Sequence, residues 1–193
     1  MAGPEPTKAN GRDRVLDAAY DLFSHNGISG VGVDAVIEEA GVAKATLYRN
    51  FDSKEDLAIA FLEQREERWT NGWVRDEVYR RETDPRKRLL AIFDIFDEWF
   101  REPDFEGCAF ITVLLELPNP NDKVHQACVD HLANIRTIVA GLAAEAGIEE
   151  PDAFARQWHI LMKGSIVSAQ EGDANAAARA KEIGTLLLDK YAS

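Results

Sequence analysis

The sequence predicts an all-α protein made of an N-terminal three-helix unit and a larger C-terminal helical domain. Apolar residues recur at helical spacing along most of the chain, and no segment alternates apolar and polar residues with the period of a strand. Capping residues and glycine or proline stops bound these helical stretches. A chain of 193 residues with 46% apolar residues is long enough to bury a proper core.

The first two helices follow from their apolar stripes. Asn10 is placed to cap the first helix, which suits Asp13 at its third position, and Gly27 is placed to end it. The second helix is predicted over residues 33–40 and is followed by Gly41. The apolar residues that join these helices are Val15, Ala18, Ala19, Leu22 and Phe23 in the first and Val33, Val36 and Ile37 in the second.

A third short helix follows Gly41. If Leu47 is buried, Phe51 falls on nearly the same side at about 100° per residue, and Arg49 points to the opposite side with Thr46 and Tyr48 on the flanks. Small, hydroxyl-bearing, aromatic and cationic side chains on one face suit a helix that enters the DNA major groove. Helix pairs joined at a glycine are also common in all-α proteins that bind no DNA, so the geometry leaves both interpretations open.

The start of the next helix favours the DNA interpretation. Ser53 is a predicted N-cap, and Asp56 completes a capping-box pattern. Lys54 then lies at a helix N-terminus, where free N–H groups and a cation can hold a phosphate together. The predicted DNA-binding residues are Lys44, Ala45, Thr46, Tyr48, Arg49, Asn50 and Lys54.

This stretch resembles the TetR family of transcriptional regulators. The resemblance covers roughly the first 60 residues and is more specific than a generic helix-turn-helix. It is carried by the amphipathic helix 12–23, Gly27, Val33, Ala40-Gly41-Val42, Thr46-Leu47-Tyr48, Phe51 and Ser53-Lys54-Glu55. It implies that residues 1–54 form an N-terminal arm and a helix-turn-helix DNA-binding domain. Residues 55–193 would form a helical domain that binds an effector and pairs with a second subunit.

The sequence departs from the family pattern at three positions. Gly32 and Ala43 stand where the family usually has Thr or Ser, so two helix caps and one phosphate contact are missing. Asn50 stands where His or Tyr is commoner. These changes bear on affinity and operator sequence more than on the family.

The charge of the chain opposes strong non-specific DNA binding. The net charge is −12, and residues 1–54 carry six cationic and eight acidic side chains. Binding would therefore depend on the local cluster Lys44, Arg49 and Lys54, and on doubling these contacts in a dimer.

The remaining chain divides into further helices. A long helix is predicted from Ser53 to about Tyr79, with Trp69, Trp73 and Val74 on its inner face. Asp84 and Pro85 start the next helix. A short helix over residues 108–117 is almost wholly apolar and is therefore predicted to be buried. Further helices are predicted over about 121–146, 151–170 and 175–191.

The C-terminal helices provide candidates for a cavity and a dimer face. A cavity for a flat or lipophilic effector is predicted to be lined by Phe93, Phe96, Trp99, Phe110, Leu114, Trp158 and Met162, each of which is also a plausible core residue. Glu116 follows an apolar run and is expected to cap or pair at the helix end rather than bind a cationic ligand. The predicted dimer interface contains Ile166, Ile183, Leu186 and Leu187, beside small alanines that allow close helix approach.

No metal, cofactor or catalytic site is predicted. His125, Cys128 and His131 recur every three residues, but this step drifts about 60° around a helix and Cys128 follows the apolar register of a core residue. The chain has no glycine-rich phosphate loop and no nucleophile elbow, so it is not predicted to be an enzyme.

Two cysteines and no signal sequence favour the cytoplasm, and no apolar run is long enough for a membrane span.

These observations predict a ligand-responsive, homodimeric transcriptional regulator, a repressor released from a palindromic DNA operator by a lipophilic or aromatic effector. The alternative is a helical protein-interaction module, derived from such a regulator, with weak or no DNA binding. The acidic balance and the missing hydroxyls at Gly32 and Ala43 favour that alternative.

Overall fold

The computed structural model describes residues 10–191, apart from the side chain of Trp73, and contains no strand within that range. The all-α prediction is therefore confirmed. Residues 1–9 of the predicted N-terminal arm and the predicted inward position of Trp73 lie outside the described part. The helices in chain order are α1 Gly11–Gly30, α2 Val33–Ala40, α3 Lys44–Asn50, α4 Lys54–Arg65, the π-helix η1 Glu66–Arg75, α5 Asp76–Arg81, α6 Pro85–Phe100, α7 Ala109–Glu116, α8 Lys123–Glu145, α9 Pro151–Gln170 and α10 Ala176–Lys190.

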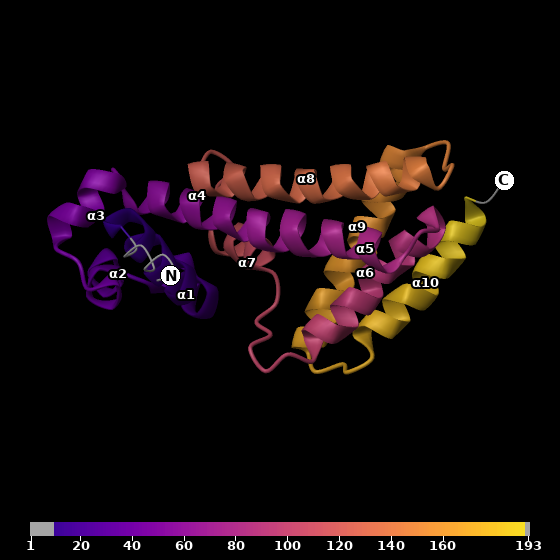
Figure 1. Ribbon diagram of the computed structural model, residues 1–193, viewed down its shortest axis with the longest axis horizontal. Helices are drawn as coiled ribbons and strands as arrows, with labels where there is room; N and C mark the ends of the chain where they lie inside the picture. Colours follow the sequence, from indigo (N-terminus) through magenta and orange to yellow (C-terminus); the bar gives the residue numbers. More distant parts are fainter. Residues whose placement is uncertain (1–9, 192–193) are drawn as a thin grey trace, which may run out of the picture.

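The molecule is elongated, with the N-terminal helices α1–α3 at one end (Figure 1). The run α4–η1–α5 extends along the long axis beside α8, which contacts α4 and η1. Helices α6, α9 and α10 pack together at the other end, and α7 lies between the two ends. The long helical run therefore connects the N-terminal unit to the far end without a flexible linker.

Local sequence signals start the helices where they were predicted. The Asn10 side chain accepts a hydrogen bond from the Asp13 N–H at 3.0 Å, and Ser53 Oγ accepts one from the Asp56 N–H at 3.1 Å. The Asp84 carboxylate accepts hydrogen bonds from two backbone N–H groups in the first turn of α6. Each cap satisfies N–H groups that have no partner within the helix.

The break at Gly27 ties the first helix to α7. Gly27 has φ 71° and ψ 165°, outside the helical region, and one further turn follows it. The Glu116 carboxylate accepts hydrogen bonds from the N–H groups of Ile28 at 3.1 Å and Ser29 at 3.2 Å. Glu116, expected to cap or pair at the end of its own helix, instead caps a helical turn of an element 88 residues away in sequence.

We expect Gly27→Ala to destabilise the protein by about 3 kcal/mol, because an L residue is strained at this φ and its Cβ would overlap the Glu116 carboxylate. Urea unfolding monitored by circular dichroism measures this loss. Gly30→Ala is the matched control, because a Cβ at Gly30 meets no atom within 4 Å. Equal stabilities of the two variants would contradict the expectation.

Two apolar cores follow one another along the long axis of the molecule. The first joins α1–α4 to α7 and the beginning of α8, with Phe110, Val113 and Cys128 among its members. The second joins α5, α6, the end of α8, α9 and α10. The N-terminal unit therefore shares its core with helices that follow residue 54, which couples its position to theirs.

The structure differs from the sequence prediction in two helices. The long helix is helical to Arg81, but η1 has the wider π form, a form that is often found near functional sites. Helix α7 is not wholly buried: Phe110 and Val113 face the core, whereas Leu115 is exposed. An eight-residue helix packed on one side cannot cover every apolar side chain, whatever its composition.

Candidate functional site

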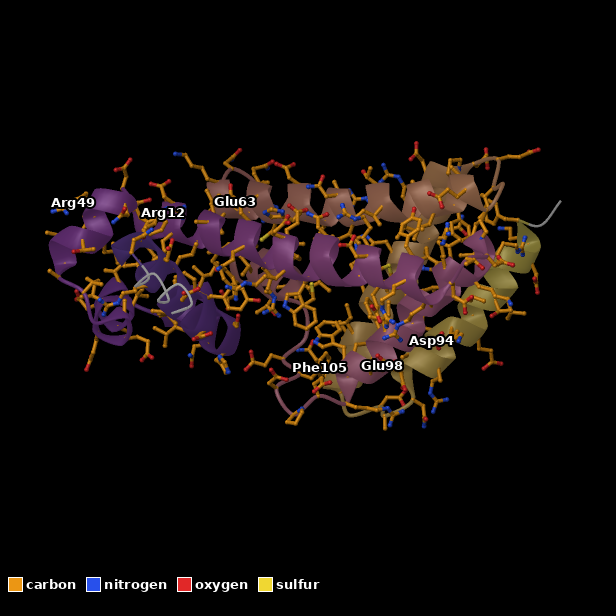
Figure 2. All side chains as sticks on the ribbon, in the orientation of Figure 1. Arg12, Arg49, Glu63, Asp94, Glu98 and Phe105 are labelled. Carbon is orange, nitrogen blue, oxygen red and sulfur yellow. The ribbon has the colours of Figure 1, made fainter. Side chains whose placement is uncertain are left out.

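Helix α3 presents the face that the sequence predicted. Leu47 and Phe51 are buried, and Arg49 is exposed on the other side. Tyr48 is 43% exposed, which is unusual for a large aromatic side chain. Figure 2 shows Arg49 at the outer end of the molecule, pointing away from the body. The position of Arg49 leaves its guanidinium free to contact a partner approaching that end.

Arg14 fixes the turn that precedes α3. Its Nη2 donates hydrogen bonds to the carbonyls of Ala40 at 2.6 Å and Gly41 at 2.9 Å. Gly41 has φ 59°, the left-handed conformation that ends a helix and that glycine adopts without strain. Arg14 is not among the residues predicted from the sequence. The available sequence signal was a cation on α1, the helix that packs against α2, whose last carbonyls need hydrogen-bond donors.

The other predicted DNA-binding residues lie around Arg49 and differ in their exposure and in their contacts with the rest of the protein. Ala45 and Asn50 are exposed, and Asn50 Nδ2 donates to the Thr46 carbonyl at 2.7 Å. Lys44 is exposed and forms an ion pair with Asp34 at 3.2 Å, which is weak because both groups face solvent. Thr46 is half-buried against the start of α1, and Lys54 is half-buried at the start of α4. The structure thus brings all seven predicted residues to one end of the molecule.

Two helix starts in this unit have no side-chain cap. Neither Gly32, before α2, nor Ala43, before α3, provides a capping hydrogen bond. The free N–H groups at the start of α3 are consequently open to solvent or to an anion.

Ala43→Ser should stabilise the protein by about 1 kcal/mol, because serine can cap α3 from the extended conformation that Ala43 already has. Thermal and urea unfolding measure the gain. Ala45→Ser, inside the same helix, is the control and should give no gain, because serine is a weaker helix former than alanine. A destabilised Ala43→Ser variant would show that the hydroxyl cannot reach the free N–H groups.

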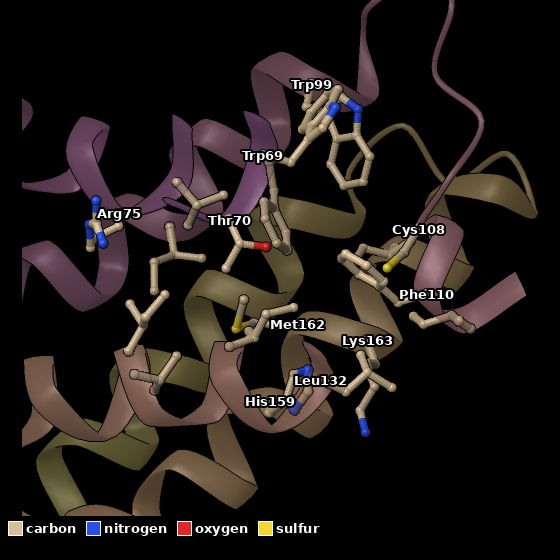
Figure 3. A pocket seen from close by; sticks show the side chains of 18 of the residues that line it. Trp69, Thr70, Arg75, Trp99, Cys108, Phe110, Leu132, His159, Met162 and Lys163 are labelled. Carbon is tan, nitrogen blue, oxygen red and sulfur yellow. The ribbon is translucent and has the colours of Figure 1, made fainter. Parts of the chain in front are cut away.

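A cavity of about 80 Å³ lies among η1, α6, α7, α8 and α9. Its surface is mostly apolar, and Figure 3 shows Trp69 and Thr70 of η1 facing Phe110 and Met162. This volume is the space open to the centre of a water-sized sphere, of which one water molecule needs roughly 10–15 Å³. The cavity therefore has room for a small molecule. The wall supplied by η1 is the π segment itself, since Trp69, Thr70 and Val74 all lie in it.

Four of the predicted lining residues surround this cavity: Phe96, Trp99, Phe110 and Met162. Phe93, Trp158 and Leu114 do not line it. Phe93 and Trp158 pack against each other, with ring centroids 5.2 Å apart, beneath Gly184 of α10, and Leu114 packs against the first core. These three residues were predicted to line the cavity because periodicity identifies the inner face of a helix. It does not show which neighbouring helix covers each part of that face.

His159 is a buried ionisable side chain in the cavity wall. It is 3% exposed, and its Nδ1 has no hydrogen-bond partner in the part of the chain that the structure describes. Burial, with smaller contributions from the charges of Lys163 and Arg136, lowers the pKa of His159 to about 3. Its imidazole is therefore uncharged at neutral pH.

This pKa predicts an acid sensitivity. Between pH 6.5, the usual His value, and about 3, the unfolded chain binds a proton that folded His159 does not, so stability falls as the pH is lowered through this window. From pH 7 to pH 5 the loss should be about 2 kcal/mol larger in the wild type than in His159→Leu. Urea unfolding at the two pH values measures the difference. Parallel losses in both proteins would contradict the prediction.

The predicted dimer residues divide into exposed and covered positions. Ile183 and Leu186 of α10 are exposed, Leu186 at 66%, and Leu187 is half-buried. Ile166 is buried and lines the cavity instead, because it lies about 100° around α9 from its exposed neighbour Val167. Exposed apolar residues on α9 that the sequence analysis missed are Ile160, at 65%, and Val167.

The residues weighed as metal ligands have other partners. Cys128 is fully buried in the first core, and burial raises the pKa of its thiol to about 12. His125 Nδ1 contacts the Leu117 carbonyl at 2.6 Å, and His131 Nδ1 contacts the Glu66 carboxylate at 2.7 Å. Among the residues that the structure describes, no three His, Cys, Asp or Glu side chains are grouped so as to hold a metal.

None of the helices between residues 10 and 191 combines the length and the apolar character that crossing a membrane requires.

Comparison with known proteins agrees with the geometry of α2 and α3. The family model described as bacterial regulatory proteins of the tetR family matches residues 15–61. The HTH-type transcriptional regulator YjdC of Escherichia coli K12 is 24% identical over 178 residues, which cover 89% of this chain and 91% of YjdC. The HTH-type transcriptional activator FasR of Mycolicibacterium smegmatis is 31% identical over 138 residues, which cover 69% of this chain and 62% of FasR.

Solved structures extend the similarity to the whole chain. The crystal structure of SCO4454, a TetR-family transcriptional regulator from Streptomyces coelicolor, matches with a TM-score of 0.85 and 28% sequence identity, and the match covers 95% of this chain and 96% of that one. These relatives and the structure, with its exposed helix α3 and its helical C-terminal domain, indicate the same family. This chain belongs to the tetR family of bacterial transcriptional regulators and carries a DNA-binding helix-turn-helix.

Proposed function

We propose that this protein is a homodimeric repressor that leaves a near-palindromic DNA operator when a small lipophilic or aromatic effector enters its cavity. In this proposal residues 1–54 bind the operator, and residues 55–193 hold the effector and form the dimer. One observation carries the proposal. The helical run α4–η1 begins beside the helices α1–α3, which form the DNA-facing unit, and ends as a wall of the cavity.

The proposed DNA contacts follow from the exposed face of α3. Arg49 can form a bidentate contact with guanine or bind a phosphate, and Tyr48 and Lys44 can bind phosphates. Lys54 adds a cation at the N-terminus of the twelve-residue α4. The acidic character of the chain makes this local cluster the main attraction for DNA, so affinity should depend strongly on its few cations.

The proposed dimer face consists of Ile160 and Val167 on α9 with Ile183 and Leu186 on α10. These four exposed apolar side chains lie on two helices that pack against each other. Exposed apolar side chains gathered on one face of a monomer are typical of a protein interface, and we propose that these four form such a face. Two subunits paired through it would present two α3 helices to half-sites about one turn of DNA, roughly 34 Å, apart.

The proposed coupling uses two physical connections between cavity and DNA-facing unit. The first is the α4–η1 run, whose π segment contributes Trp69 and Thr70 to the cavity wall. The second is α7, which lines the cavity through Phe110 and holds the end of α1 through Glu116. An effector that fits better when either element is displaced would favour a subunit arrangement with the wrong half-site spacing.

Fluorescence anisotropy with labelled DNA tiles from the region upstream of the protein's own gene tests the proposal, at two salt concentrations. The expected result is saturable binding to one tile that weakens with salt and is competed only by that tile. Absence of any sequence-specific complex, at low salt and on a library of random duplexes as well, would instead support the protein-interaction alternative.

The direction of regulation needs its own experiment, because the relative FasR is named an activator. In vitro transcription from a promoter that contains the preferred tile separates the two outcomes. Repression predicts that transcript levels fall when the protein is added. A rise in transcript would overturn the repressor part of the proposal and leave the DNA-binding part intact.

A further inference from the structure

The cavity offers no internal partner for a charged ligand. No carboxylate lines it in the described chain. Of the three cations at its wall, Arg65 donates a hydrogen bond to Tyr20 Oη at 3.0 Å, and Arg75 pairs with Asp76 at 3.0 Å. Figure 3 shows the ammonium of Lys163 directed away from the centre of the cavity. A charge brought inside would therefore lose its hydration without gaining a counter-charge, which is costly.

The wall of the cavity contains a hydrogen-bonding atom that the described chain does not use. His159 lies in its wall, on α9, with a ring nitrogen that is buried and has no partner in the described chain. An unsatisfied buried polar group costs free energy that a ligand can recover by bonding to it. Because the imidazole is uncharged at neutral pH, it suits a hydroxyl or amide better than an ion.

A cleft beside the cavity points the same way. Trp69 and Trp99, with ring centroids 5.1 Å apart, line both the cavity and this cleft. The cleft is acidic on balance: it is lined by five carboxylates and by the basic side chains of Arg65 and His25, and two of the carboxylates are paired, Glu98 with Arg81 and Glu106 with His25. The carboxylates are those of Asp21, Glu98, Glu102, Asp104 and Glu106. A negatively charged ligand would be repelled by the cleft. A positively charged one would be attracted to the cleft but would find no carboxylate in the cavity.

We propose that the cavity binds an uncharged, largely apolar compound whose single hydroxyl or amide group forms a hydrogen bond with His159. The inference rests on the proposed function in taking this cavity as the effector site. The apolar body of the ligand lies against Phe96, Phe110 and Met162, and its polar group lies against α9. The site thus selects by the absence of charge as much as by shape.

Isothermal calorimetry with four probes of one shape tests this selection on the full chain, without DNA and at neutral pH. The probes are 4-ethylphenol, ethylbenzene, 4-ethylbenzoate and 4-ethylbenzylammonium. The phenol should bind about three- to tenfold more tightly than ethylbenzene, the worth of one net hydrogen bond. Both ions should bind at least about tenfold more weakly than the phenol, because their charge is not compensated inside the cavity.

Variants at His159 identify the hydrogen-bonding group. His159→Leu should bind ethylbenzene as the wild type does and should lose the preference for the phenol. His159→Gln keeps a hydrogen-bonding side chain and should retain most of the preference. His125→Leu, on α8 and outside the cavity lining, is the matched control and should keep the preference in full. Thermal unfolding of each variant shows whether it is folded before its binding is compared.

Three results would overturn the inference: tightest binding by either ion, an unchanged phenol preference in folded His159→Leu, or no binding of the phenol at millimolar concentration. Failure of the proposed function has a different signature, because it is measured by release of operator DNA. A phenol that binds through His159 but does not change DNA affinity would contradict effector-controlled binding and support the ligand class. Release of DNA only by one of the two ions would support effector-controlled DNA binding and contradict the proposed ligand class.

Discussion

Arg49→Ala should lower the affinity for the operator by about 30-fold or more. A bidentate contact between arginine and guanine contributes about 1–3 kcal/mol of discrimination, and a dimer loses two such contacts, one in each half-site. Arg49 is exposed on the outer face of α3 and makes no hydrogen bond or ion pair within the described residues, so its loss removes a DNA contact without disturbing the fold. Fluorescence anisotropy on the preferred tile measures the change.

A control is needed because removing any cation from this acidic protein weakens its attraction to DNA. Lys87→Ala removes an exposed cation from α6, far from α3 along the molecule. It should change operator affinity by about twofold at most, since exposed charges more than a Debye length away are screened. Thermal unfolding of both variants should match the wild type. An operator affinity unchanged by Arg49→Ala would show that α3 does not read the DNA.

The DNA-facing unit could be predicted because its determinants are local. The burial of Leu47 and Phe51 follows from their four-residue separation, which places both on one side of a helix. The caps at Asn10 and Ser53 follow from hydrogen bonds that span three residues. Such features depend on neighbours in the sequence and are therefore visible without the fold.

The cavity was only half predictable, because its shape depends on contacts between distant elements. Phe93 and Phe96 belong to one apolar stripe, yet Phe93 packs under α10 and Phe96 lines the cavity. Ile166 and Val167 are adjacent, yet one lies in the cavity wall and the other faces solvent. Periodicity assigns each side chain to the inside or the outside of a helix, and only the packing of helices shows what each inside position faces.

Two connecting features could not have been found by pattern at all. The hydrogen bonds from Ile28 and Ser29 to Glu116 join residues almost half the chain apart. The π form of η1 carries no composition that separates it from the α-helices on either side. Both features lie between the cavity and α3, so the elements that would carry coupling are the ones that the sequence does not reveal.

Leu186→Glu should convert the dimer to a monomer and lower operator affinity by about 100-fold or more. The side chain is 66% exposed on α10, beside Ile183, so glutamate is tolerated in the monomer but would place two carboxylates in the apolar face of a dimer. A monomer binds one half-site, and the gain from linking two half-sites, about 10²–10⁴ in affinity, is lost. Light scattering gives the mass, and anisotropy gives the affinity.

Leu115→Glu provides the matched control, because Leu115 on α7 is an equally exposed leucine outside the proposed dimer face. It should remain dimeric and bind the operator as the wild type does. If Leu186→Glu stays dimeric while Leu115→Glu becomes monomeric, the dimer forms through α7 and the two α3 helices face different directions from those proposed. If both stay dimeric, the exposed residues of α9 and α10 serve another partner. The proposed release mechanism requires that pairing through α9 and α10 sets the spacing between the two α3 helices. Either result would contradict that requirement.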